Sequence, residues 1–138
     1  MDALTFLSTQ SSPIRLAVID DDGFPIVCSL WFILNEDHIL CASHASAKII
    51  RVLKKNPNCA FEVSINEMPY KGVRGKAIAS LEKDSDGLVL GQLLERYVGN
   101  SQPSLTKWLL SRSQDEYAIR LEIKTMSTWD FSARMQGK

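Results

Sequence analysis

The chain has 138 residues, the size of one domain, and its 45% hydrophobic and 23% charged residues are typical of a folded globular protein. Sixteen basic residues balance sixteen acidic ones, and this zero net charge disfavours broad binding to nucleic acid or to a membrane surface. No stretch approaches the roughly 20 apolar residues that cross a bilayer, and the first residues lack the features of a secretory signal. We therefore expect one cytoplasmic domain over residues 1–138.

Hydrophobic patterning predicts three strands on short turns in the first third of the chain. The first is IRLAVIDD, residues 14–21, and the aspartates at 20–22 with Gly23 are expected to form a solvated turn. The second is PIVCSLWFIL, residues 25–34, which is apolar at both alternating sets of positions. We expect both of its faces to be covered, by the core, a ligand or a partner. The third is HILCAS, residues 38–43, and the three strands together predict an antiparallel meander.

The next segment, from Ser46 to Asn56, has the apolar spacing of an amphipathic helix. Either Ser43 or Ser46 can cap its start, and Pro57 ends it.

The rest of the chain predicts further strands and two more helices. The expected strands cover 58–66, 70–84 and 116–124, the expected helices cover 86–98 and 103–113, and the tail STWDFSARM is a last strand or an extended arm. Gly72 and Gly75 interrupt the long strand, which indicates a bulge or the close approach of another backbone or ligand. Strands on short turns commonly close to hide their edges. The pattern therefore predicts a mainly β fold, an antiparallel barrel of about six or seven strands with about three peripheral helices.

The three cysteines, Cys28, Cys41 and Cys59, lie within apolar runs and form no C-x-x-C pair. We interpret them as buried, reduced thiols. The two histidines, His38 and His44, do not lie at ligand spacing from a cysteine, so no metal site is predicted.

The loop within CASHASAKIIRVLKKNP, residues 41–57, allows two interpretations. A helix start offers free N–H groups and about half a positive charge. The hydroxyls of Ser43 and Ser46 would add donors and Lys48 a full charge, which together would suit a phosphate. The same residues also suit an ordinary helix start with a serine cap and an exposed lysine. The loop alone leaves both interpretations open.

The order of the segments is more specific than any one of them. RLAVIDDDGFPIVCSLWFIL, ILCASHASAKIIRVLKKNPNCAFEV and YKGVRGKA follow one another in an order that resembles the pyridoxamine 5′-phosphate oxidase-like family of FMN-binding split β-barrels. The resemblance covers residues 14–82 well and 115–135 more loosely. It implies a homodimer with FMN at the subunit interface, and an FMN-dependent oxidoreductase that acts on a small molecule.

The resemblance also implies which residues contact the cofactor, although it assigns no catalytic residue. They are Ser29, Leu30 and Trp31 at the flavin ring, Ser43, Ser46 and Lys48 at the phosphate, and Tyr70, Lys71 and Trp129 near the flavin, with Trp129 coming from the second chain. The chain departs from the family at Ala47, where a second basic residue is common. It also lacks the C-terminal arginine and histidine pattern that grips the substrate phosphate in true pyridoxine-phosphate oxidases, so another substrate is implied.

Two other functions stay open. Proteins of this fold also bind FMN, haem or a deazaflavin without an evident reaction, and with haem His38 or His44 would become candidate ligands. The third possibility is a barrel that binds nucleic acid through aromatic residues and lysines. The zero net charge and the expected burial of Trp31 and Phe32 as core aromatics disfavour it.

Overall fold

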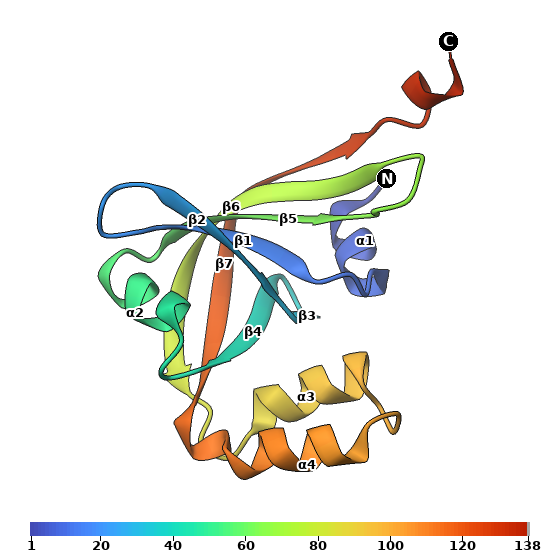
Figure 1. Ribbon diagram of the computed structural model, residues 1–138. Helices are drawn as coiled ribbons and strands as arrows, with labels where there is room; N and C mark the ends of the chain where they lie inside the picture. The colour runs from blue at the N-terminus through green and yellow to red at the C-terminus, as the bar shows by residue number, and fades with distance from the viewer. Residues whose placement is uncertain (138) are drawn as a thin grey trace.

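One curled antiparallel sheet organises the molecule, as the computed structural model of residues 1–137 shows (Figure 1). Its strands are β1 (Ile14–Ile19), β2 (Pro25–Leu30), β3 (Ile33–Asn35), β4 (His38–His44), β5 (Asn58–Ser64), β6 (Lys71–Lys83) and β7 (Glu116–Asp130). Their order in the sheet is β2-β1-β5-β6-β7-β4-β3. Only Trp31 and Phe32 separate the edge strands β2 and β3, so the sheet curls to bring one end of each edge close to the other. The predicted mainly β antiparallel barrel is confirmed.

Four α-helices surround the sheet, one more than predicted. They are α1 (Ala3–Thr9), α2 (Lys48–Lys55), α3 (Leu88–Tyr97) and α4 (Pro103–Ser111), and two 3-10 turns lie at Ser113–Asp115 and Arg134–Gln136. The unpredicted helix α1 is capped by the Asp2 carboxylate, which accepts the Thr5 N–H, and it buries Leu7 completely. Helices α3 and α4 lie side by side below the barrel (Figure 1). Within residues 1–137, no helix has the length and apolar character needed to cross a bilayer.

The core lies between the inner face of the sheet and the apolar stripes of α1 and α2. Alternate residues of β1 are fully buried, as the predicted alternation requires. Helix α2 buries Ile49, Ile50, Val52 and Leu53, which are the residues of its predicted stripe. Cys41 and Cys59 are buried and Cys28 is partly buried, and all three are free thiols. Burial raises the pKa of the Cys59 thiol to about 11, which keeps this thiol protonated and unreactive.

The predicted strand over 25–34 is in fact two strands. The chain breaks at Trp31 and Phe32, because helix α3 provides the hydrogen bonds that a neighbouring strand would otherwise provide. The Phe32 N–H donates to the Tyr97 hydroxyl (3.3 Å), and the Phe32 carbonyl accepts from Arg96 Nη1 (3.0 Å). The core covers only one face of β2, since Val27 on the other face is 68% exposed. Cover of that face by a ligand or a partner stays a prediction.

The strand predicted over 116–124 continues through the tail to Asp130, because β6 pairs with it along its whole length from Lys71 to Lys83. Gly72 and Gly75 mark close approaches, as predicted. A Cβ on Gly72 would lie 2.9 Å from the Trp129 ring, and one on Gly75 would lie 2.8 Å from the Phe61 ring and against the Thr125 carbonyl. The register shift itself lies next to them, between Lys76 and Ala77.

Two glycine substitutions should therefore change stability in opposite directions. We expect Gly75→Ala to lower the free energy of unfolding by about 1–3 kcal/mol, because its Cβ would overlap backbone and ring atoms. Gly91→Ala should raise it by up to about 1 kcal/mol, because Gly91 lies inside α3 and a Cβ added there would meet no atom within 4 Å. Urea titration of the two variants measures both changes. Equal changes in the free energy of unfolding at the two positions would show that the protein can accommodate a Cβ at Gly75.

Candidate functional site

The loop between β4 and α2 forms the first part of the candidate site. Helix α2 begins at Lys48 with Ala47 as its N-cap residue, and no side chain caps it. The predicted serine cap is therefore wrong, because the Ser46 hydroxyl lies 2.7 Å from His44 Nδ1. Ser43 is still in strand β4, where it pairs with Tyr117. The first turn of α2 keeps its N–H groups without a side-chain acceptor, which is the arrangement that an anion requires.

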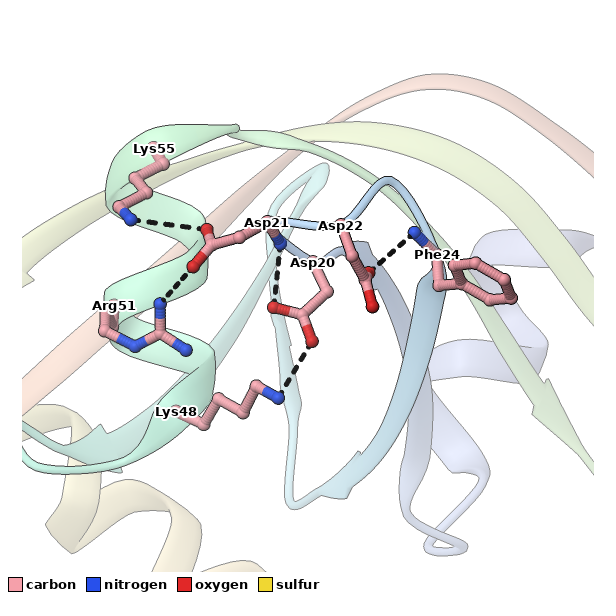
Figure 2. Close-up of polar contacts among 7 residues, drawn as sticks. All are labelled: Asp20, Asp21, Asp22, Phe24, Lys48, Arg51 and Lys55. Atoms are coloured by element: carbon pink, nitrogen blue, oxygen red, sulfur yellow. Dashed lines mark hydrogen bonds and ion pairs between the residues drawn. The ribbon is translucent and has the colours of Figure 1, made fainter.

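The turn between β1 and β2 lies along α2, with contacts from its first residue to its last. Lys48 Nζ is 2.8 Å from the Asp20 carboxylate, and Asp21 accepts from Arg51 (2.8 Å) and Lys55 (3.3 Å), as Figure 2 shows. The expected solvated turn is thus bound to the helix through ion pairs. The hydrogen bond from Lys48 lowers the pKa of Asp20, and the hydrogen bond from Arg51 lowers that of Asp21.

These ion pairs change the charge that a phosphate would meet. Lys48, the one lysine predicted to hold a phosphate, is already paired with an internal carboxylate. Three cations of α2 pair with two carboxylates of the turn, and the third carboxylate, Asp22, bonds the Phe24 N–H instead of a cation. An anion at the start of α2 would share Lys48 with Asp20 or displace it.

The predicted flavin strand borders a cavity of about 320 Å³. Its lining residues are Pro13, Ser29, Leu30, Trp31, Ala42, Leu90, Leu93, Leu109 and Glu116. Trp31 is neither a fully buried core residue nor a free surface one, because it is half-buried and stacks on Tyr97 with ring centroids 5.4 Å apart. Ala42 directly precedes Ser43 on β4. The single chain therefore brings Ser29, Leu30 and Trp31 close to the strand that leads into the α2 loop.

The remaining predicted residues, Tyr70, Lys71 and Trp129, lie at the opposite end of the long strands. Strand β7 has 15 residues, roughly 50 Å along its length. Ser43 pairs with its second residue, and Trp129 is its last but one. Arg74 lies over the Trp129 ring (5.2 Å), and the buried Nε1–H of this tryptophan has no acceptor within residues 1–137. One chain cannot place these residues beside Lys48; a second chain could.

A wide groove on the outer face of the sheet is a feature that the sequence did not reveal. It encloses about 650 Å³ between β2, β1, β5, β6 and β7, and small or apolar residues form its floor: Ala17, Val27, Ala60, Gly75 and Met126. Arg15, Glu62 and Arg74 lie among them, with Glu62 and Arg74 paired at 3.3 Å. The sequence did carry a signal for this groove: Ala17 and Ala60 are small residues that alternate with the buried residues of their strands.

The two histidines have little freedom to bind a haem iron. His38 Nδ1 lies 2.8 Å from Asp37, and its Nε2 lies 3.0 Å from Arg120. His44 contacts Ser46 through Nδ1 and Arg112 through Nε2 (3.3 Å). Either histidine would have to lose a contact to ligate iron. In the part of the chain that the structure describes, no cluster of three potential metal ligands occurs.

Comparison with known proteins identifies the fold. No protein-family model and no curated protein sequence matches the chain. An F420 reductase matches in structure with a TM-score of 0.73 and 22% identity, over 88% of this chain and 93% of the other. A pyridoxamine 5′-phosphate oxidase-like protein from Listeria innocua matches with 0.68 and 13%, over 91% and 93%. HutZ, the haem storage protein from Vibrio cholerae, matches with 0.70 and 24%, over 92% and 91%.

At sequence identities this low, the TM-scores show that these proteins and this chain share a fold. The chain has the split β-barrel fold of pyridoxamine 5′-phosphate oxidase-like proteins, so the predicted resemblance in fold is confirmed. The nine residues predicted to contact a cofactor stay a prediction.

The ion pairs of the turn generate a pH dependence. Because the folded-state pKa of Asp20 and Asp21 is lowered, their stabilisation is complete above the ordinary aspartate pKa, near 4, and is lost as pH falls through the lower folded-state values. Between about pH 5 and pH 2, we expect the double variant Asp20→Asn, Asp21→Asn to lose less free energy of unfolding than the wild type. Urea titrations across this range measure it. The control is Asp22→Asn, whose carboxylate bonds the Phe24 N–H and no cation; it should keep the wild-type acid sensitivity.

Proposed function

We propose that the protein is a flavoprotein that binds FMN at the interface of a homodimer and acts as an FMN-dependent oxidoreductase on a small molecule. The observation that carries the proposal is the path from Ser29–Trp31, past Ala42 of β4, to the uncapped start of α2. This path offers an apolar wall at one end and N–H groups with positive charge at the other. FMN has the same polarity, with an apolar ring at one end and a phosphate at the other. The F420 reductase among the structural neighbours agrees with a flavin-type cofactor.

The residues at the start of α2 fit a phosphate. Lys48 supplies the charge, the helix N–H groups and the Ser46 hydroxyl supply donors, and Arg51 adds a second cation one turn along. Bound FMN would supply a ring N5 that accepts or gives a hydride, which needs no protein base. The role of the chain is then to orient the ring, through the backbone of Ser29–Trp31, and to exclude water.

A homodimer would complete the site. The outer groove and the exposed Val27 give the sheet an uncovered apolar face, which is the kind of surface that subunits bury. A second copy on this face would bring its own Tyr70, Lys71 and Trp129 toward the first copy's flavin strand.

Binding without a reaction is the second candidate, and the likeness to a haem storage protein favours it. The ligand would be FMN, haem or a deazaflavin. The contacts of His38 and His44 count against haem held by either histidine. Turnover separates the two candidates, because a storage or carrier protein would neither consume a nicotinamide donor nor oxidise an amine.

The absorption spectrum of freshly purified protein tests the proposal. We expect the visible bands of an oxidised flavin, and mass spectrometry of the molecule released by boiling should identify FMN. A strong Soret band would instead indicate haem. A colourless protein that takes up no added FMN would contradict the proposal.

Two substitutions at one ion pair should move FMN affinity in opposite directions. Lys48→Ala should weaken FMN about ten- to a hundredfold, since a charged contact to phosphate contributes about 1.5–3 kcal/mol. Asp20→Asn should strengthen it, because it removes the carboxylate that holds Lys48. Riboflavin, which has no phosphate, should respond to neither change, and fluorescence titration measures both ligands. Lys55→Ala, on the same helix but paired with Asp21, is the matched control. Equal losses for FMN and riboflavin would show that Lys48 acts through the fold.

A further inference from the structure

One buried carboxyl group stands apart from the residues discussed so far. Glu116 is the first residue of β7 and pairs with His44 of β4. Only 9% of its surface is exposed, and its side chain lines the 320 Å³ cavity beside Trp31. Its backbone carbonyl accepts the Asp84 N–H. Its carboxyl oxygens are not among the fully enclosed, unpartnered polar atoms of residues 1–137, so they remain accessible from the cavity.

The walls around this carboxyl group are almost entirely apolar. Trp31 and Leu30 come from the β2 end, Leu90 and Leu93 from α3, and Leu109 from α4. Besides Glu116, the Ser29 hydroxyl and the Trp31 indole N–H are the polar side-chain groups of the residues that line this cavity in the described chain. Apolar walls leave a carboxylate poorly hydrated, so the arrangement favours a ligand that brings a donor.

The charged groups on the neighbouring elements do not supply that donor. Asp84, between β6 and α3, uses its carboxylate to accept the N–H groups of Val89 and Leu90. Arg112, at the end of α4, lies over the Trp108 ring (4.7 Å) and against His44. Burial raises the pKa of Glu116, Asp84 raises it further, and His44 and Arg112 act in the opposite direction.

We propose that this cavity binds a small organic cation, an amine or amidine, whose N–H groups donate to Glu116 while its apolar body packs on Trp31 and the leucines. Three residues of the wall, Ser29, Leu30 and Trp31, are those assigned to the flavin ring, so this ligand would lie beside the cofactor. The inference thus rests on the proposed function for the role of the ligand, and it names the substrate class. Glu116 sets the specificity: it selects the charge of the ligand.

The experiment compares benzylamine with benzyl alcohol, which has the same shape without the charge. Calorimetric titration of the wild type, with and without FMN, should show benzylamine binding at least tenfold more tightly than benzyl alcohol. Benzylamine affinity should rise with pH as Glu116 ionises, and then level off. Glu116→Gln should lose at least tenfold for benzylamine, together with this pH dependence, and should leave benzyl alcohol unchanged. Glu122→Gln removes the same charge from an exposed position of the same strand and should change nothing.

Equal binding of the two probes by the wild type, or no binding of benzylamine, would overturn the inference. These wild-type measurements decide the matter even where Glu116→Gln fails to fold. A protein that binds FMN but not benzylamine overturns the inference and keeps the proposed function. A protein that binds benzylamine through Glu116 but takes up no flavin supports the cation site and overturns the flavin proposal.

Discussion

The pairing of β6 with β7 is the constraint on which the rest of the molecule depends. It is the longest pairing in the sheet, with strands of 13 and 15 residues, and every other strand lies to one side of it or the other. The pairing fixes Ser43 at one end, through Tyr117, and Trp129 at the other. A chain built on such a ladder has two half-sites far apart. Antiparallel association of two copies is the simplest geometry that would bring unlike halves together, which gives a physical reason for a dimer in the proposed function.

The contact between Lys48 and Asp20 gives this lysine an internal partner that an arriving anion would displace. Exposed ion pairs of this kind contribute little to stability, because water screens them and the side chains lose freedom. Asp20 therefore competes for Lys48, but weakly enough for a phosphate to displace it. A phosphate carries more charge and more acceptor oxygens than one carboxylate, and it would also meet the free N–H groups of α2. Both its greater charge and its contacts with the helix N–H groups therefore favour the phosphate over Asp20 as the partner of Lys48.

The sequence predicts those structural features that are determined by residues close together in the chain. The stripe of Ile49, Ile50, Val52 and Leu53 predicts α2, and period-two alternation predicts β1 and β5. The sequence does not predict features that are determined by contacts between residues far apart in the chain. The break between β2 and β3 is made by Tyr97 and Arg96, which lie 65 and 64 residues away from Phe32. The missing serine cap is a different case, because the Ser46 hydroxyl contacts His44, only two residues away, instead of the helix start.

The candidate site follows the same division. Its half at the β4–α2 loop could be predicted because strand, loop and helix are contiguous, whereas the cavity with Glu116 joins β2, β4, β7, α3 and α4. No local pattern marks Glu116, which stands in EYAIRLEIK as one more polar residue at a strand start. Its place in an apolar cavity nevertheless carries chemical information. An anionic substrate would meet an uncompensated carboxyl group there, whereas a cation would relieve it. This electrostatic preference agrees with the missing arginine and histidine pattern, since both features are unsuited to a phosphorylated substrate.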